Sequence, residues 1–295
     1  MIRVAIFFFC MMFSMGVSFA NGEVSPKEKS ALVDLFNSTN GKDWNSSWDL
    51  TAPLNTWKGV RIEKGHVVGL TLFMNNLSGT LPESIGNLKY LNELNLAFNQ
   101  ITGVLPKNVV KLKKLTVLRL EMNRIKGAIP TGVGDLKNLE VFSMFNNFLT
   151  GPIPESFGEL KNLKELNLSS NNLKGIIPKS IGNLTNLEAL GLFENKLEGN
   201  IPKEMGNLVK LEELVLSNNQ LGGEIPAEFG QLASLKVLQL QNNKFYSFKT
   251  LHGMDSKKFL VFDSDDTTLS PRFNDIQIDR TRMVDTKFED ADENE

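Results

Sequence analysis

Residues 160–183 read LKNLKELNLSSNNLKGIIPKSIGN, and the chain repeats this stretch with little change every 24 residues. The clearest marker is the asparagine that closes the LxLxxN part of the pattern. A fixed period of this length is typical of solenoid proteins, whose repeats stack on one another. The asparagine recurs with no insertion or deletion between the first copy and the last, at Asn75, Asn99, Asn123, Asn147, Asn171, Asn195, Asn219 and Asn243.

The other fixed positions of the repeat predict one strand and one bend. Leu166 and Leu168 alternate with polar residues, which is the signature of a strand with one buried face. Gly175 and Pro178 follow at fixed offsets from Asn171; glycine permits a tight bend, and proline fixes φ. One repeat has no partner for its leucines, whereas stacked repeats cover one another. The pattern therefore predicts an α/β solenoid with a parallel sheet.

We interpret the recurring asparagine as a buried ladder. Its side chain has two N–H donors and an acceptor oxygen, enough to satisfy backbone groups where the strand turns inward. The alternative is an ordinary surface turn residue, and the unbroken register of the eight copies disfavours it.

From about Val67 to Phe245 the chain follows the pattern LxxLxxLxLxxNxLxGxIPxxhGxL, in which h is apolar. This pattern resembles the leucine-rich repeats of the plant-specific type, found in receptor-kinase ectodomains and polygalacturonase-inhibitor proteins; similar secreted repeats occur in bacteria, oomycetes and algae. The resemblance implies a right-handed superhelix with a parallel β-sheet on the concave face, 3-10 or irregular structure on the convex side and a helical N-terminal cap. It implies binding without identifying a ligand, because this scaffold carries many unrelated tasks.

Residues 1–20 have the composition of a secretory signal peptide. Arg3 is followed by an apolar stretch and then by Ser18-Phe19-Ala20, a small-x-small cleavage site. The alternative is an uncleaved membrane anchor, but the stretch is shorter than the ~20 apolar residues that a spanning helix needs. We expect cleavage after Ala20, no membrane span afterwards, and a secreted protein that is extracellular, periplasmic or at the cell surface.

The only cysteine, Cys10, lies inside this segment, so the cleaved chain would have no disulfide. Plant receptor ectodomains of this repeat type normally close their caps with paired cysteines, and the difference favours a bacterial or other microbial relative. The chain has 32 basic and 34 acidic residues, a formal net charge of −2, which disfavours nucleic acid as a partner.

The remaining sequence divides into caps, repeats and a tail. Residues 21–64 are the expected N-terminal cap, with a helix that starts near Ser25 and three tryptophans, Trp44, Trp48 and Trp57. We expect the tryptophans to cover the exposed end of the first repeat; stacking on a sugar is the alternative. Residues 65–255 hold about eight repeats, residues 256–280 form a C-terminal cap with a covering strand at Phe259–Phe262, and residues 281–295 form an acidic disordered tail.

Few residues of the sequence suggest catalysis. The two histidines, His66 and His252, lie near opposite ends of the solenoid, too far apart for a metal site or a triad. Asp263, Asp265 and Asp266 mimic the start of a calcium loop, but the position that needs glycine holds threonine. No nucleophile elbow or phosphate-cradling loop occurs. We therefore predict a non-enzymatic protein without cofactor or metal, with a monomer as the default state.

Positions between and beside the strand leucines face the concave surface, so the residues of this surface are readable from the repeats. Aromatic residues and arginine are the usual anchors of binding hot spots, and we place the two glutamates on a polar rim. The alternative is that the aromatics only pack on one another as a ridge. The candidate ligand-binding residues are Phe73, Phe98, Arg119, Glu121, Phe145, Phe193 and Glu194.

Together these features predict a secreted, non-catalytic module that recognises a protein, or with less support a glycan, through the concave face of a leucine-rich-repeat solenoid. One alternative is a structural or adhesion protein of the cell surface. Another is an accessory to cell-wall polysaccharide enzymes, which has less support because the sequence shows no pair of carboxylates in differing environments.

Overall fold

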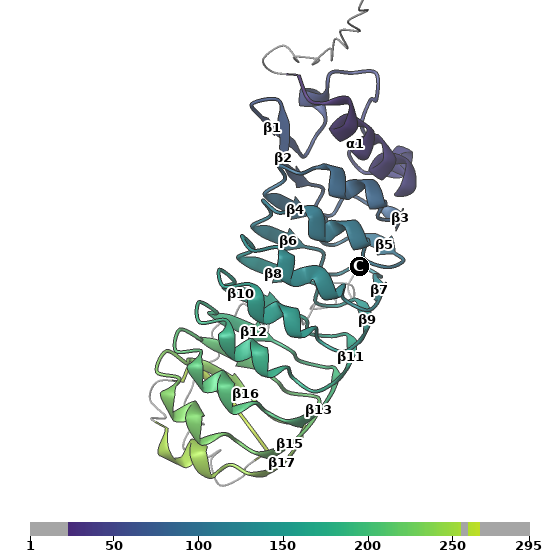
Figure 1. Ribbon diagram of the computed structural model, residues 1–295. Helices are drawn as coiled ribbons and strands as arrows, with labels where there is room; N and C mark the ends of the chain where they lie inside the picture. Colours follow the sequence, from purple (N-terminus) through teal and green to yellow (C-terminus); the bar gives the residue numbers. More distant parts are fainter. Residues whose placement is uncertain (1–22, 255–258, 266–295) are drawn as a thin grey trace, which may run out of the picture.

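The computed structural model describes residues 23–254 and 259–265, which form a curved stack of repeats (Figure 1). The predicted solenoid is confirmed by a ten-stranded sheet that is parallel apart from its first strand pair. The expected signal peptide and the expected acidic tail lie outside the described residues, as does most of the expected C-terminal cap.

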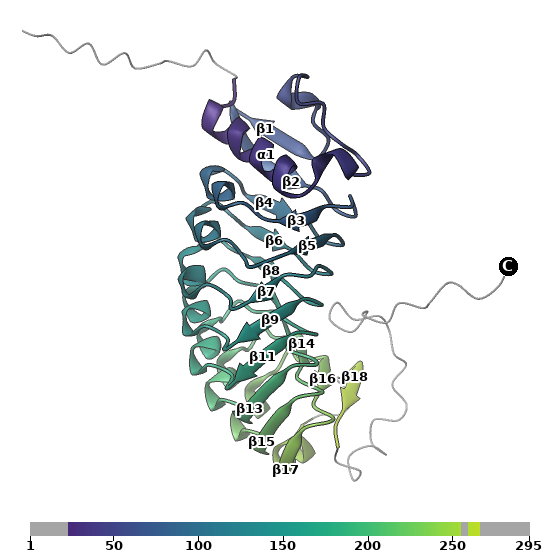
Figure 2. The same cartoon turned by 90° about the vertical axis from the view of Figure 1, so that its right-hand side faces the viewer.

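The inner sheet runs along the concave side of the stack (Figure 2). In-register pairing places Leu94 beside Leu118 and Leu166 beside Leu190, and all four side chains are fully buried. The sequence period therefore becomes a row of leucines in one continuous core. In sheet order the strands are β1 (Val60–Glu63), β2 (His66–Thr71), β4 (Glu93–Asn95), β6 (Val117–Arg119), β8 (Val141–Ser143), β10 (Glu165–Asn167), β12 (Ala189–Gly191), β14 (Glu213–Val215), β16 (Val237–Gln239) and β18 (Val261–Asp263).

Short 3-10 helices form the convex side of the curve (Figure 2). From η3 to η9 each helix follows the proline of its repeat, as Pro178 precedes η7, because a fixed φ suits the start of a helical turn. Neighbouring strands of a sheet lie ~4.8 Å apart. A helical turn takes up more space along the stack than a strand does, so the stack curves and its strands lie on the inner side. The helices are η1 (Gly41–Asp43), η2 (Leu54–Thr56), η3 (Glu83–Asn87), η4 (Lys107–Lys111), η5 (Thr131–Asp135), η6 (Glu155–Glu159), η7 (Lys179–Asn183), η8 (Lys203–Asn207), η9 (Ala227–Gln231) and η10 (Lys249–Gly253).

A second set of parallel strands, which the repeat pattern did not predict, lies where the chain passes from the inner sheet to the 3-10 helices. In β11 the alternation is only Asn172-Leu173-Lys174 before Gly175 turns the chain at φ 84°. Leu173 is buried between its exposed or half-buried neighbours, so β11 adds one core residue. The strands are β3 (Ser78–Thr80) paired with β5 (Gln100–Thr102), and β7 (Lys126–Gly127), β9 (Phe148–Gly151), β11 (Asn172–Gly175), β13 (Lys196–Asn200), β15 (Gln220–Glu224) and β17 (Lys244–Ser247) in one sheet.

The recurring asparagines connect neighbouring repeats by hydrogen bonds. Asn171 Nδ2 donates to the carbonyl oxygens of Met144 and Leu168 at 3.0 and 3.1 Å, and its Oδ1 accepts from the Leu149 amide at 2.9 Å. The side chain is buried, and the same bonds recur one repeat further on at Asn195. From Asn99 to Asn243 each such asparagine thus satisfies backbone groups of its own repeat and of the preceding one. The predicted burial does not hold for the last two, because Asn219 and Asn243 are half-buried.

The N-terminal cap consists of α1 (Pro26–Ser38), η1, η2 and the antiparallel pair β1–β2. Trp44, Trp48 and Trp57 are buried within it and pack on one another, with stacked Trp48 and Trp57 rings 4.8 Å apart. Their ring N–H groups donate to the backbone carbonyls of Thr39, Lys58 and Asp49. All three are core residues, so the structure contradicts the alternative that they stack on a sugar.

At the other end, β18 continues the inner sheet as one more parallel strand. Leu238 pairs with Phe262, in the register that the leucines keep in earlier repeats. The Asp265 carboxylate accepts from the backbone amides of Asn242 and Asn243 at 2.9 and 3.2 Å. At the end of the described chain, Asp265 therefore satisfies two backbone N–H groups of the preceding repeat.

Candidate ligand-binding face

The candidate ligand-binding face is the concave surface of the inner sheet, formed by the strand residues that point away from the core. In-register pairing turns each sequence position into a column that crosses the sheet. The largest member of the central column is an arginine on β6, and most of the others are small or uncharged. The column reads Thr71, Asn95, Arg119, Ser143, Asn167, Gly191, Val215 and Gln239.

Phe73 and Phe98 form an aromatic pair at the N-terminal end of the concave face. Their ring centroids are 5.1 Å apart, and 48% of Phe73 is exposed. Met74 beside them is also exposed, and Met74 and Phe98 both adopt positive φ angles, 49° and 58°, in the turn after the strand. The turn thus presents apolar side chains at the edge of the sheet, where soluble proteins seldom place them together.

Arg119, Glu121 and Glu165 form a charge cluster at the centre of the concave face. The Arg119 guanidinium lies 3.2 Å from Glu165 Oε2 and 3.5 Å from Glu121 Oε1. Glu121 was expected on an exposed polar rim, but only 6% of it is exposed, so that expectation was wrong. Burial raises the pKa of the Glu121 carboxyl above its usual value, and its backbone amide, Arg119 and the Ser143 hydroxyl oppose this rise only in part.

Phe193 lies apart from this cluster, in an apolar patch toward the C-terminal end. It packs against the buried side chains of the patch, and its own side chain is half-buried. Phe145 is also half-buried. The buried members of the patch are Ala189, Val215, Val237 and Val261.

Glu194 lies in the turn after β12, with a φ of 51°, and is exposed. Its carboxylate accepts a 2.8 Å hydrogen bond from the Ser170 hydroxyl of the preceding repeat. Both residues line a cleft of about 410 Å³, with Phe148 and Lys196, where the chain turns from the inner sheet to the second sheet. Glu194 therefore faces the edge of the solenoid and is separate from the central charge cluster.

Carboxylates recur along the inner strands, at or just before the first strand residue. Several are already paired: Arg61 lies 3.1 Å from Glu93, Lys164 2.7 Å from Glu140, and Lys236 3.0 Å from Glu212. The hydrogen bond to Glu140 raises the pKa of Lys164. The acidic residues of this surface are Glu93, Glu140, Glu165, Glu188, Glu212 and Glu213.

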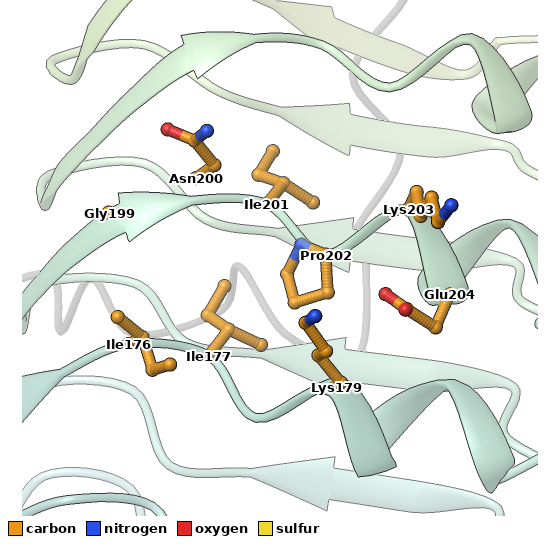
Figure 3. A pocket seen from close by; sticks show the side chains of 9 residues that line it. All are labelled: Ile176, Ile177, Lys179, Gly199, Asn200, Ile201, Pro202, Lys203 and Glu204. Atoms are coloured by element: carbon orange, nitrogen blue, oxygen red, sulfur yellow. The ribbon is translucent and has the colours of Figure 1, made fainter.

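A second cavity, of about 520 Å³, opens on the flank of the solenoid away from the concave face (Figure 3). Ile176, Ile177 and Pro202 form its apolar wall, with Lys179 and Glu204 near the 3-10 helices. It holds no histidine or cysteine, and no group of three metal-ligating side chains occurs within residues 23–254 and 259–265. In the same part of the chain, no helix has both the length and the apolar character to cross a membrane.

Family models match the repeats in two places. A model described as "Leucine-rich repeat region" matches residues 70–174. One described as "Leucine Rich Repeat" matches residues 210–232.

Several solved structures share the fold. The PEPR1-AtPEP1 complex is 31% identical, with a TM-score of 0.72, over 80% of this chain and 34% of that one. The Arabidopsis receptor kinase HAESA, in complex with the peptide hormone IDA and the co-receptor SERK1, is 42% identical, with a TM-score of 0.56, over 58% and 28%.

A leucine-rich-repeat protein of Leptospira interrogans is 38% identical, with a TM-score of 0.51, over 59% of this chain and 43% of that one. This chain thus spans less than half of the length of each of these three proteins. The repeat pattern, the stacked parallel strands and these similarities make the chain a leucine-rich-repeat protein that resembles plant receptor ectodomains and the Leptospira protein.

Proposed function

We propose that the chain is a secreted, non-catalytic binding module that recognises an extended protein segment through the concave face. The observation that carries this proposal is the central charge cluster, in which the buried carboxylate of Glu121 lies beside the partly exposed Arg119. The similar HAESA structure holds a peptide hormone. A peptide ligand is therefore favoured over a glycan for this chain.

The dimensions of the concave face suit an extended segment. Arg119 on β6 and Phe193 after β12 are separated by three strand steps, or ~14 Å at the usual strand spacing. An extended chain rises ~3.3 Å per residue, so about four residues would cover that distance. A short segment would reach both the charge cluster and the apolar patch, which are different in chemistry and would fix its direction.

The test begins with a pull-down from cell-surface extracts, with residues 21–295 as bait, followed by titration of the recovered ligand against variants. Phe73→Ala removes an exposed ring from the concave face, and Phe145→Ala removes a half-buried ring in the same column as Glu121. We expect each to weaken binding by roughly 1–3 kcal/mol.

The control is Lys137→Ala on the convex side, whose side chain is exposed and pairs with Glu159. If Lys137→Ala weakens binding and both phenylalanine variants keep it, the ligand binds another face. Thermal melts of all variants separate loss of contact from loss of folding. Phe193→Ala would be a poor probe of contact, because its ring is part of the apolar patch.

A further inference from the structure

We propose that the central charge cluster is a subsite for one cationic side chain, arginine or lysine, of the bound segment, and that this side chain pairs with Glu121. The inference rests on the proposed function and adds to it the chemical class of the group that binds at the centre of the concave face.

Glu121 lacks sufficient partners within its own chain. Only 6% of the residue is exposed, and its Oε2 is hidden from solvent with no partner at hydrogen-bond distance among the described residues, although the nearby Ser143 hydroxyl favours the charged form. A buried carboxylate is unfavourable unless it is paired and hydrogen-bonded. The repeat does not require it, because the equivalent positions hold Ala97, Ser169 and Ser217. A buried acid that the fold does not need, with one oxygen unused, indicates a role in binding.

The charge balance around Glu121 favours a cation. One guanidinium, that of Arg119, serves both Glu121 and Glu165, so with both carboxyls ionised the cluster has one negative charge more than it has positive charges. On the strand before, Glu93 already pairs with Arg61. From β8 the cluster is faced by uncharged Val141 and Ser143. A bound cationic group would neutralise the excess negative charge, whereas an anionic group would add a third negative charge.

The surroundings of the cluster also suit a cationic side chain. Phe145 occupies the position after Glu121 in the same column, one strand or ~4.8 Å further along the sheet. A half-buried aromatic ring beside a carboxylate is suited to a guanidinium or ammonium group, which pairs with the acid and lies against the ring. Two carboxylates with an arginine between them do not form a metal site, so a cationic side chain is the ligand class that fits.

The pH dependence of binding follows from the same geometry. Burial raises the pKa of Glu121 in the free protein, and a bound cation would favour the charged carboxylate and lower that pKa. Binding would then release a proton whenever the free carboxyl is protonated. Affinity for the cationic side chain should therefore decrease as the pH falls through the raised pKa of free Glu121 and be constant above it.

The experiment uses two capped peptides, acetyl-Gly-Gly-Arg-Gly-Gly-amide and the same peptide with citrulline in place of arginine. Citrulline keeps the shape of arginine and removes its charge. Each peptide is titrated by NMR into the protein of residues 21–295 and into its Glu121→Gln and Glu140→Gln variants. Glu140→Gln is the matched control, because the Glu140 side chain, one residue before β8, is 43% exposed and already pairs with Lys164.

We expect wild type and Glu140→Gln to prefer the arginine peptide by about tenfold, as a charge-assisted hydrogen bond would give. Glu121→Gln should lose the preference. The inference is overturned if wild type binds both peptides equally or binds neither at millimolar concentration. It is also overturned if Glu140→Gln loses the preference as fully as Glu121→Gln, because general attraction to an acidic face would then explain the binding.

The ligand recovered by pull-down separates this inference from the proposed function. If Phe73→Ala and Phe145→Ala weaken its binding while Glu121→Gln leaves it unchanged, the concave face binds the ligand and the cationic subsite is wrong. If none of the concave variants affects its binding, the proposed function fails as well.

Discussion

The ladder asparagine acts at the scale of single atoms: its two N–H bonds and one oxygen hold backbone groups of two successive repeats. Asn171 bonds to Met144 and Leu149 of the preceding repeat and to Leu168 of its own. Alanine would leave buried backbone groups without partners, which costs more than the bond itself contributes. Aspartate would keep the size but lose both donors, so the amide is the group that suits this position.

Replacement of Asn171 by alanine should lower the free energy of unfolding by roughly 1–3 kcal/mol. The matched control is Asn162→Ala, which also removes an asparagine that donates to a backbone carbonyl, at 2.9 Å, but in an exposed position. Urea denaturation of the two variants measures the difference. Equal losses would contradict the ladder interpretation.

Glu121→Gln should raise the melting temperature at pH 7. The folded-state pKa of Glu121 is raised by burial, while the unfolded chain has the ordinary value of ~4.3. Between these two values the native state binds more protons, so stability falls as pH rises through this window and stays lower above it. Glutamine removes that effect, and its advantage should fade toward pH 4, where both states are mostly protonated. A thermal melt series from pH 4 to pH 8 tests this; an unchanged difference across the series would contradict it.

At the scale of elements, the N-terminal cap depends on one acid that joins α1 to β2. Glu28 follows Ser25 in a capping-box arrangement, and the Ser25 hydroxyl donates to its Oε2 at 2.9 Å. Its Oε1 accepts from the Val67 amide at 3.1 Å, and Nδ1 of His66 lies 3.3 Å from Oε2. Glu28 is 4% exposed. The helix α1 therefore contacts β2 through a buried carboxylate as well as through its apolar side chains.

Glu28→Ala should destabilise the cap by roughly 1–3 kcal/mol, because the buried Val67 amide loses its acceptor. Hydrogen exchange by mass spectrometry should show faster exchange in α1 and β2 than in β14 or β16. The control is Glu63→Ala, an acid at the end of β1 whose side chain is 63% exposed. Uniform acceleration along the whole chain would mean that the cap does not act as a separate unit.

Most of the fold was predictable because its causes recur in every repeat. The leucine pairs predicted the inner strands, and the proline after each glycine predicted where the convex side begins. The second sheet was missed because Asn172-Leu173-Lys174 gives one alternation, too few residues to distinguish a strand from a turn. The concave positions were predictable as columns, but burial was not: Glu121 and Phe73 occupy equivalent positions in the repeat, and only neighbouring side chains make one buried and the other exposed.

At the scale of the whole molecule, the solenoid is held together by contacts between neighbouring repeats. The pairings run from β4 to β6 to β8 and from η6 to η7 to η8. In such an array stability is close to a sum over repeats and their interfaces. Because the period is constant, one whole repeat can be removed without changing the register of the others. Such a deletion changes the distance between parts of the concave face while the fold stays intact, which a substitution does not do.

Deletion of residues 160–183 should leave a folded solenoid with one inner strand fewer, because Leu184 then occupies the position of Leu160. It would bring Arg119 and Phe193 closer by one strand step, ~4.8 Å. Deletion of residues 208–231 also removes one repeat but leaves their spacing unchanged. Circular dichroism should show both variants folded, with melting temperatures lowered by a few degrees, whereas removal of residues 160–171 alone should break the register and unfold the chain.

Binding should distinguish the two whole-repeat deletions. A segment that contacts the charge cluster and the apolar patch at once needs a fixed separation between them, so the deletion of residues 160–183, which also removes Glu165, should abolish tight binding of the recovered ligand. The deletion of residues 208–231 should retain most of it, weakened by the loss of Val215 from the apolar patch. If both deletions bind equally well, the ligand contacts only one of these two parts, and a local site has to replace the extended one.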